Sequence, residues 1–411
     1  MAEIIVIGGG AAGMLAALTA ARQGMDVTLL ERNEKLGKKL YITGKGRCNV
    51  TNDCTVDEFM QETPRNPRFL YSALSGFTPQ DMMALLEDGG CPVVVQRGRR
   101  VFPATEKASD VTRTLTRLMQ SAGVRVRLNT RVKGILTDDA GVTGVQLVTG
   151  ETLPCQRVIL ATGGCSYPMT GSTGDGYAMA EALGHTIVKP TAVLSALETE
   201  EAWPADLQGL SLKNVTLTLK KGKKTLYTEL GEMLFTHFGI SGPLVLTMSC
   251  HLPEDLSTIA VTLDLKPGLT AEQLDARLQR EFTANLRKQL RNVLPALLPA
   301  RLAEIFPGLC AIDGDKPCGQ ITRQERETLV QLMKALPFTI RKARPLAEAI
   351  VTRGGVSVKE ISPATMESKL VPGLHFAGEV IDLDAHTGGY NLQIAWCTGH
   401  AAGAACAETL Y

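Results

Sequence analysis

The feature that most constrains the fold is a glycine-rich turn near the start of the chain. An apolar run, Ile4–Ile7, leads into Gly8-Gly9-Gly10-Ala11-Ala12-Gly13, and a second apolar run, Val27–Leu30, ends at Glu31. The turn fits the pattern G-x-G-x-x-G, whose glycines make the turn, admit a pyrophosphate and let a helix pack on the sheet. We therefore predict a strand–helix–strand unit that binds a dinucleotide, with Glu31 accepting hydrogen bonds from a ribose.

The same stretch has an alternative interpretation as a membrane or signal segment, because residues 4–21 contain no charge. Three consecutive glycines, the lack of a basic region before Ile4 and the return of a strand pattern toward Glu31 argue against it. No other long apolar run occurs, so we expect a soluble protein that does not enter a membrane.

Composition narrows the class of protein. The chain has 411 residues, enough for two or more domains, and its net charge of +1 gives no general attraction to nucleic acid or membrane. Ten cysteines without a secretion signal predict free thiols in the cytoplasm. No Cys-x-x-Cys pair or Cys/His cluster has zinc spacing, so we expect no metal.

The order of the predicted elements indicates an interrupted domain. Residues 1–190 alternate helices and strands and include Val158–Gly164, an apolar strand that ends in a glycine turn, as parallel strands do above a ligand. From residue 191 the sequence pattern predicts strands with alternating apolar residues and then amphipathic helices. A strand followed by a glycine turn is predicted again at Gly373–Glu379. We predict one doubly wound α/β domain, residues 1–190 and 339–411, interrupted by an inserted domain, residues 191–338.

Individual elements follow from periodicity and from turn residues. Helices are predicted at 66–75, 79–88, 109–122, 323–336 and 394–407, and between 271 and 305 with interruptions at Pro295 and Pro299. Strands are predicted at 93–96, 124–128, 133–137, 142–148, 157–161, 215–219, 225–230 and 259–265, with Lys220–Lys224 as a charged hairpin turn.

Two further segments favour a flavin as the dinucleotide. Lys38–Asn52 is rich in glycine, hydroxyl and cationic groups that suit an extended cofactor, although an ordinary surface loop is the alternative. Thr387–Gln393 places a Gly-Gly-x-Asn turn before a helix, where N–H groups would stabilise a reduced flavin ring. The alternative is an ordinary helix with Asn391 as its cap. Only one G-x-G-x-x-G turn is properly placed, so a one-site pyridine-nucleotide dehydrogenase also fits.

A series of motifs gives the chain a family resemblance. In order they are the opening turn with Glu31, Thr43–Asn52, Gly98–Pro103, Ala161–Gly164, Thr173–Ala180, Leu234–Pro243 and Gly388–Asn391. Together they resemble a bacterial FAD flavoprotein family whose members are described as BaiN-like bile-acid reductases, aminoacetone oxidases and ribosomal RNA dihydrouridine synthases. The resemblance spans essentially the whole chain. It implies a Rossmann-like FAD-binding domain of the glutathione and fumarate reductase type, with an inserted β-barrel plus a small helical subdomain.

The resemblance also implies residue roles. The opening turn and Glu31 would hold the adenosine diphosphate, Val132 would reach the adenine through backbone groups, Glu379 would lie near the ribityl chain, and Gly389–Asn391 near the isoalloxazine. The cofactor candidates are Gly8, Gly10, Ala11, Ala12, Gly13, Glu31, Arg32, Thr43, Gly44, Arg47, Cys48, Asn49, Val132, Ala161, Thr162, Gly163, Gly378, Glu379, Gly388, Gly389, Tyr390 and Asn391.

The leading hypothesis is a reductase of an activated C=C bond that uses non-covalent FAD, with NAD(P)H as a transient electron donor. Its substrate would be a steroid-like enone or a uracil of ribosomal RNA, and an amine oxidase is the alternative. No protein partner is implied. His237, flanked by Phe235 and Phe238, is the first candidate proton donor, although a buried structural histidine is the commoner outcome. His386 and Tyr167 are the other candidates, and we expect the insert to form one wall of the active site.

Two other functions receive less support. Cys48 and Cys54 have Cys-x5-Cys spacing, which differs from the Cys-x4-Cys of disulfide reductases, so we expect free thiols of which one lines the cofactor site. Lys213 and the Lys220–Lys224 run, with Tyr227 close by, give a local basic stretch that would suit RNA. A charged hairpin that is merely solvated is the alternative.

Overall fold

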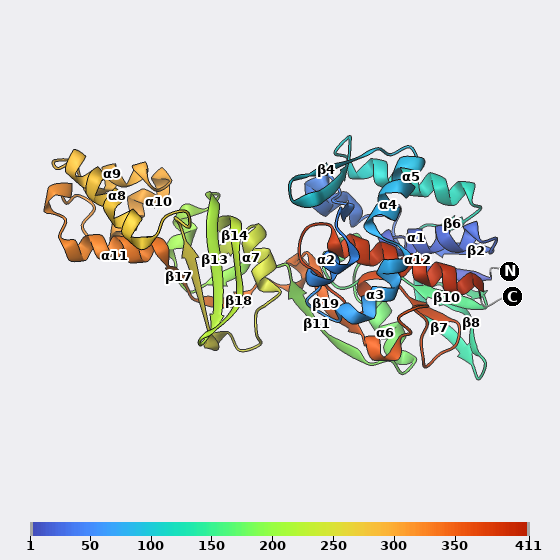
Figure 1. Ribbon diagram of the computed structural model, residues 1–411. Helices are drawn as coiled ribbons and strands as arrows, with labels where there is room; N and C mark the ends of the chain where they lie inside the picture. Colours follow the sequence, from blue (N-terminus) through green and yellow to red (C-terminus); the bar gives the residue numbers. More distant parts are fainter. Residues whose placement is uncertain (1–2, 409–411) are drawn as a thin grey trace. The chain divides into compact units, whose positions relative to one another are not determined.

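The computed structural model describes residues 3–408, which form two compact units. The first unit contains the residues up to Val193 and those from Pro345 onward, and the second contains Leu194–Arg344 (Figure 1). These limits lie a few residues beyond the boundaries expected from the sequence. The reason is strand pairing: β11 (Ile187–Val193) pairs with β19 (Val351–Val356) in the first unit, and β18 (Ile340–Ala343) pairs with β12 (Leu197–Thr199) in the second.

A five-stranded parallel sheet forms the centre of the first unit. Four of its strands are short, mostly apolar and almost wholly buried, as expected for a parallel sheet covered on both faces. The edge strand β6 contains two arginines and is partly exposed. In spatial order the strands are β20 (Leu374–Phe376), β10 (Arg157–Leu160), β1 (Ile4–Ile7), β2 (Val27–Leu30) and β6 (Arg125–Arg127). Strand β10 lies between β1 and β20. It is the strand whose carboxyl end we expected to lie beside a ligand.

Helix α1 (Ala11–Arg22) packs closely against α12 (Tyr390–Glu408), drawn in red beside it in Figure 1. Added Cβ atoms at Gly399 and Gly403 of α12 would lie 2.4 Å from the carbonyl oxygens of Ala12 and Ala16. Glycine is therefore required at both positions for the two helices to approach. Helix α12 begins at Tyr390 rather than at the predicted Ile394.

The remaining elements of the first unit surround this core. They include α5 (Ala108–Ser121), which also packs on α1, and the helices α2 (Val56–Gln61), α3 (Pro67–Gly76), α4 (Pro79–Asp88) and α6 (Asp175–Ala182). Two small antiparallel sheets contain β3 (Thr51–Asn52), β5 (Arg100–Pro103) and β4 (Val93–Gln96), and β7 (Val132–Asp138), β8 (Gly141–Leu147) and β9 (Thr152–Pro154). The elements that were predicted, namely α3, α4, α5, β4, β7 and β8, agree with the predictions to within a few residues, whereas α2, α6, β3, β5 and β9 were not predicted.

The second unit is built on a seven-stranded antiparallel sheet in the order β17-β16-β13-β14-β15-β12-β18. The other strands are β13 (Ser211–Lys221), β14 (Lys224–Thr236), β15 (Gly239–Ser241), β16 (Ile259–Asp264) and β17 (Leu336–Phe338). The predicted hairpin turn is confirmed, because β13 ends at Lys221 and β14 begins at Lys224. Among the residues described, no pairing joins β17 to β18, so closure into a barrel stays a prediction.

Helices complete the second unit. They are α7 (Pro243–Ser249), α8 (Ala271–Ala284), α9 (Leu290–Val293), α10 (Ala300–Leu309) and α11 (Arg323–Lys334). Thr270 and Thr322 begin α8 and α11 with reciprocal capping boxes. Pro295 and Pro299 separate the short α9 from α10, as predicted, while α11 ends before the predicted Leu336 because Leu336 begins β17.

Candidate active site

The glycine turn after β1 is as tight as its sequence requires. An added Cβ at Gly8, whose φ is +107°, would lie 2.4 Å from the carbonyl oxygen of Ala161, and one at Gly13 would lie 1.8 Å from the carbonyl oxygen of Gly8. Around Gly10, by contrast, no described atom lies within 4 Å of a Cβ position, and no side chain caps α1 there. The first-turn N–H groups of α1 therefore border open space, which is the environment that a phosphate group needs.

Glu31 fixes the end of β2 and remains able to bind a ribose. Its Oε2 accepts a hydrogen bond of 2.7 Å from the Gly9 N–H, and its Oε1 accepts bonds of 2.7 Å from both the backbone N–H and the side-chain amide of Asn33. The carboxylate is buried. Because an ionised carboxylate offers about four acceptor positions, acceptor capacity remains for ribose hydroxyls after these three bonds.

A charged network that the sequence did not indicate joins the loops after three parallel strands. Lys39 Nζ donates to Glu379 Oε2 at 2.6 Å and to Ser166 Oγ at 2.7 Å. Glu379 Oε1 accepts from Ser166 Oγ at 3.1 Å and from the Thr352 N–H at 2.8 Å. These groups follow β2, β10 and β20 and include one residue of β19, so the carboxyl ends of the parallel strands are held together at the edge where α/β sheets bind ligands.

Two buried polar atoms of the predicted cofactor segments have no hydrogen-bond partner among the described residues. They are Asn49 Oδ1, in the loop after β2, and Thr162 Oγ1, directly after β10. A buried polar group without a partner costs about 1–3 kcal/mol. The open N-terminus of α1, the spare acceptor capacity of Glu31 and these two atoms together fit an extended polar cofactor such as FAD.

Arg47 and Cys48 differ from their expected roles. The Arg47 guanidinium lies over the ring of Phe102, 4.4 Å from its centroid, and contacts Glu106 Oε1 at 3.2 Å. The Arg47 charge is therefore already paired within the protein.

The two cysteines near the predicted cofactor segment are buried. Burial raises the pKa of the Cys48 thiol to about 12 and that of the Cys54 thiol to about 11. Both are free thiols with no thiolate at neutral pH, which argues against the disulfide reductase alternative.

The glycine turn before α12 packs directly on β3. An added Cβ at Gly389 would lie 2.3 Å from the carbonyl oxygen of Thr51, and Asn52 Nδ2 donates to the Gly388 carbonyl at 3.1 Å. Asn391 lies inside the first turn of α12, so the alternative that Asn391 caps the helix is wrong. Its side-chain amide accepts from the Ala385 N–H at 3.0 Å and donates to the Ala385 carbonyl at 2.7 Å, which shapes the preceding turn.

The other candidates divide between the two units. In the first unit, Arg32 bonds Thr173 and Asp175, buried Val132 begins β7, and Tyr167 has a left-handed backbone with φ of +49°. His386 lies there too, with Nδ1 2.9 Å from Glu62 Oε2. The remaining cofactor candidates, among them Ala11, Ala12, Thr43, Gly44, Gly163 and Gly378, also belong to the first unit.

His237 belongs to the second unit, on the turn between β14 and β15. It is exposed rather than buried, and its ring packs edge-on against Phe238, with centroids 4.9 Å apart. Phe235 belongs to the insert that we expected to form one wall of the active site, but its side chain is fully buried in the core of this unit against Trp203 and Phe338. Phe235 is therefore a core residue.

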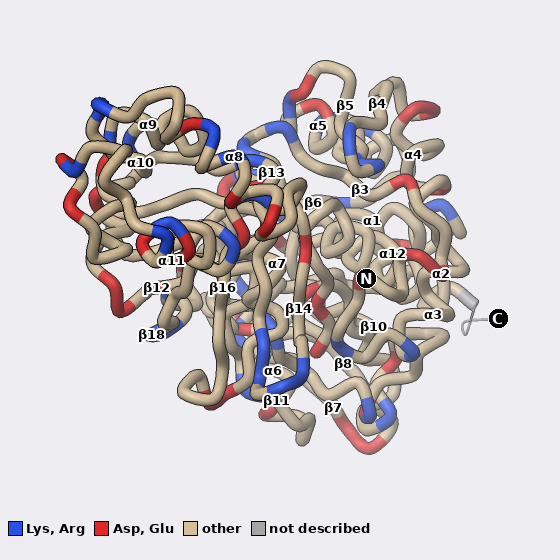
Figure 2. Tube along the Cα trace, turned by 60° about the vertical axis from the view of Figure 1, so that its left-hand side comes forward, with Lys and Arg blue, Asp and Glu red and all other residues tan. Residues whose placement is uncertain are grey.

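The basic hairpin lacks the aromatic group that RNA stacking would need. Figure 2 shows acidic and basic residues interspersed over both units, with lysines at the tip of the β13–β14 hairpin. The Tyr227 side chain is buried, its ring stacks on His251, and its hydroxyl donates to Glu229 Oε2 at 2.7 Å. Tyr227 is therefore unavailable to a nucleic-acid base.

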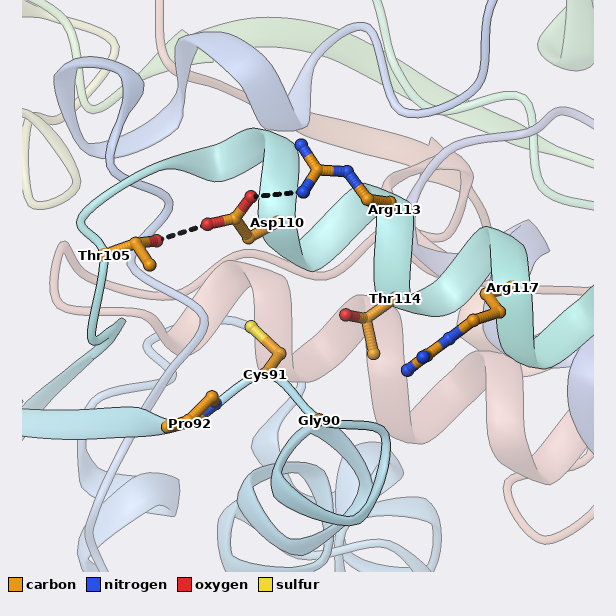
Figure 3. Close-up of a pocket in the computed structure, with 8 residues that line it drawn as sticks. All are labelled: Gly90, Cys91, Pro92, Thr105, Asp110, Arg113, Thr114 and Arg117. Atoms are coloured by element: carbon orange, nitrogen blue, oxygen red, sulfur yellow. Dashed lines mark hydrogen bonds and ion pairs between the residues drawn. The ribbon is translucent and has the colours of Figure 1, made fainter.

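A pocket of about 320 Å³ opens between the end of α4 and α5 (Figure 3). At the α5 side of this pocket, Asp110 accepts from Thr105 Oγ1 at 2.5 Å and pairs with Arg113 at 3.2 Å. The pocket lining includes none of the predicted site residues.

Among residues 3–408, no helix is long and apolar enough to cross a membrane. In the same residues, no group of three or more His, Cys, Asp or Glu side chains is placed to hold a metal.

The parallel sheet, the open helix N-terminus and the acid at the end of β2 define a Rossmann-like FAD-binding fold of the kind found in flavoprotein oxidoreductases. The chain belongs to the HI0933-like family, since the family model of the HI0933-like protein Rossmann domain matches residues 2–405.

Full-length relatives support the same assignment. The 3-dehydro-bile acid delta(4,6)-reductase of Clostridium scindens is 32% identical over 417 residues, which cover 99% of this chain and 100% of the relative. The ribosomal RNA dihydrouridine synthase of Haemophilus influenzae is 34% identical over 405 residues, 97% of each chain. The structure of a quinol–fumarate reductase with menaquinol has the same fold, with a TM-score of 0.54 and 18% identity over 99% of this chain and 71% of that chain.

Proposed function

We propose that this protein is an FAD-dependent oxidoreductase that transfers a hydride from reduced flavin to an activated carbon–carbon double bond. The observation that carries the proposal is the pair of names borne by full-length relatives, a delta(4,6)-reductase of a 3-dehydro-bile acid and a ribosomal RNA dihydrouridine synthase. A conjugated 3-oxo steroid and a uracil ring both contain an electron-poor alkene. One hydride-transfer reaction therefore accounts for both names.

The first unit would hold the cofactor. The N-terminus of α1 would bind the pyrophosphate, Glu31 a ribose, Asn49 and Thr162 polar groups along the cofactor, and the Gly388–Gly389 turn the isoalloxazine. When bound, reduced FAD would supply the hydride. The Lys39–Glu379–Ser166 network would keep the surrounding loops in place, so that little reorganisation is needed on binding.

NAD(P)H is the proposed electron donor, and it would bind transiently. The sequence supports transient binding, because only one G-x-G-x-x-G turn is properly placed. The sequence therefore predicts no second dinucleotide-binding fold that would hold NAD(P)H. Without a binding domain of its own in the protein, NAD(P)H would reach the flavin through the same opening as the substrate.

Saturation of an alkene also needs a proton. His386 is the favoured donor because it lies in the same unit as the cofactor candidates, just before the Gly388–Gly389 turn. Imidazole gives and takes a proton near neutral pH, which suits this role. His237 and Tyr167 remain the competing candidates.

The experiment compares two acceptors. The reduced protein is mixed anaerobically with an unsaturated 3-oxo steroid, while ribosomal RNA from a strain lacking the gene is digested and analysed for dihydrouridine. Rapid flavin reoxidation by the steroid alone identifies a small-molecule reductase, whereas loss of a dihydrouridine site identifies the RNA enzyme. If neither acceptor responds and primary amines reduce the oxidised flavin instead, the protein is an amine oxidase and the proposal is wrong.

A further inference from the structure

The hairpin of β4 and β5 ends in a turn that is rich in arginine. Gln96 pairs with Arg100 across the two strands, so Arg97, Gly98 and Arg99 form the turn between them. Gly98 and Arg99 have left-handed backbone conformations, with φ of +74° and +55°. All residues of this arginine turn, Arg97–Arg100, are exposed to solvent. It begins the sequence motif Gly98–Pro103, to which the cofactor site described above gives no role.

One side chain joins the arginine turn to the turn proposed for the isoalloxazine. The Asn52 amide Nδ2, on β3, donates to the Gly98 carbonyl at 3.0 Å and to the Gly388 carbonyl at 3.1 Å. The next residue, Asp53, donates its backbone N–H to the Arg99 carbonyl at 2.8 Å. A single amide group therefore separates the arginine turn from the Gly388–Gly389 turn, beside which the flavin would meet its substrate.

Two arginines of the turn carry a charge that the protein does not neutralise. Arg99 pairs with Glu58 at 2.7 Å. In the part of the chain that the structure describes, no carboxylate pairs with Arg97 or Arg100, and Arg100 Nε donates only to the Arg97 carbonyl, at 3.1 Å. Neighbouring charges have partners of their own, since Arg47 pairs with Glu106 and Asp53 accepts a hydrogen bond from Gln80.

The basic hairpin of β13 and β14 shows what is particular to the arginine turn. Its lysines, Lys220 and Lys224 among them, are exposed as well, but they belong to the second unit, which contains none of the cofactor candidates. A charged turn that is merely solvated can lie anywhere on the surface. A guanidinium group beside the cofactor site offers more, because its planar set of N–H donors matches a phosphate and its face can stack on a base.

We propose that the arginine turn binds the phosphate backbone of an RNA substrate, with Arg97 and Arg100 as the contacts. The proposal rests on the function proposed above and selects the RNA uracil from its two acceptors. Two exposed guanidinium groups without carboxylate partners suit a ligand with successive negative charges, and RNA carries one phosphate per nucleotide, whereas a small acid offers a single carboxylate. Phosphate contacts set the register and orientation of a strand, so that a uracil can reach the flavin.

The test measures RNA binding by the oxidised, FAD-loaded protein. The anisotropy of a fluorescein-labelled single-stranded RNA that contains uridines is followed at several KCl concentrations. Arg97→Gln/Arg100→Gln removes two phosphate contacts, so affinity should fall about 10-fold or more and the slope of log K against log[KCl] should decrease in magnitude by about 1.4. The matched control, Lys220→Gln/Lys224→Gln, removes the same charge from the second unit and should leave affinity and slope unchanged.

A conservative variant separates charge from structure. Arg97→Lys/Arg100→Lys keeps both charges but loses the hydrogen bond from Arg100 Nε to the Arg97 carbonyl. The slope should therefore stay close to that of wild type, because it counts the phosphates that are neutralised. A lysine variant with the slope of the glutamine variant would show a structural role only and would overturn the proposal. Flavin content and thermal melting check that each variant folds.

The other outcomes are equally decisive. A wild-type protein that binds no RNA, or a glutamine variant with unchanged affinity and slope, would overturn the proposal. Normal RNA binding by the glutamine variant, with slow reoxidation by an unsaturated 3-oxo steroid that bears a carboxylate, would assign the turn to that carboxylate instead. Because RNA binding is measured without an electron donor, a protein that binds RNA through this turn and is reoxidised by no alkene would contradict the proposed function alone.

Discussion

The Glu31 carboxylate holds the glycine turn through its hydrogen bond from Gly9, and the proposal gives the same carboxylate a ribose of the cofactor. Glu31→Gln would replace one oxygen with an amide that faces the N–H donors of Gly9 or Asn33. The neutral amide also offers fewer and weaker acceptor positions to the ribose hydroxyls, and losing a hydrogen bond to a charged group costs about 1.5–3 kcal/mol, so FAD affinity should fall about 10-fold or more. Fluorescence titration of the apoprotein with FAD measures this change.

The control for that prediction is Glu151→Gln. Glu151 is a half-exposed acid that pairs with Arg127 on the surface of the same unit, so its loss should leave FAD affinity unchanged. Equal affinities for Glu31→Gln and wild type would show that Glu31 does not bind the cofactor.

The buried thiols should be unreactive in the folded protein. Burial raises the pKa of Cys48 to about 12 and that of Cys54 to about 11, so neither forms the thiolate that alkylating reagents attack. At pH 7.5, mass spectrometry after iodoacetamide treatment should find both unlabelled, and labelled only after denaturation. Labelling of Cys48 in the native protein would restore the thiol-chemistry alternative.

The candidate residues that the sequence predicts are those whose proposed role is local. Gly8, Gly13 and Glu31 follow from the spacing of one strand–helix–strand unit, because the glycine turn and the acid at the end of β2 both belong to that unit, although Gly8 also approaches Ala161. Lys39 and Glu379 bond each other across a sequence separation of 340 residues, and no local pattern marks such a pair. His386 was predicted as a candidate from its neighbouring glycines, but its partner Glu62 could be identified only from the folded chain.

The close contact between helices α1 and α12 predicts that a side chain at Gly399 lowers the free energy of unfolding. Gly399→Ala would place a Cβ 2.4 Å from the Ala12 carbonyl oxygen, and overpacking of this kind costs about 1–3 kcal/mol. The matched control is Gly308→Ala in α10, where nothing lies within 4 Å and alanine should stabilise the helix by up to about 1 kcal/mol. Urea unfolding measures both, and equal effects of the two substitutions would contradict the close packing.

Most elements followed from periodicity, and the exceptions have physical reasons. The β13–β14 hairpin and the capped α8 and α11 carry strong local signals, namely alternation, a charged turn and capping residues. The start of α12 was missed because Asn391, a residue type that favours turns and helix caps, was grouped with the preceding glycines. Helix α7 was missed because it is short and buried, so its apolar residues show no helical periodicity.

For the whole molecule, buried titratable groups predict a stability plateau between about pH 6.5 and 9. Burial raises the pKa of Cys48, Cys155, Cys310 and Cys406 from 9.0 to about 12. Unfolded thiols therefore release protons above pH 9 while folded ones do not, and stability falls by about 1.4 kcal/mol per thiol per pH unit.

Burial lowers the pKa of His185, His375 and His400 below 6.5. The unfolded chain therefore takes up protons below pH 6.5 that the folded protein excludes, and stability also falls toward acid. Calorimetric melting between pH 5 and 10.5 measures both limits. A melting temperature that stays constant from pH 8 to 10.5 would contradict the burial of these thiols.

FAD binding by the first unit underlies every residue role proposed above, and chromatography of the released cofactor tests it. The purified protein is precipitated with acid and its supernatant is separated against FAD and FMN standards. We predict about one FAD per chain and no flavin in the pellet, because the adenosine end has a built site in the α1 N-terminus and Glu31 and nothing indicates a covalent link. Release of FMN, a flavin retained in the pellet, or a colourless protein that takes up no FAD would contradict non-covalent binding of FAD by the first unit.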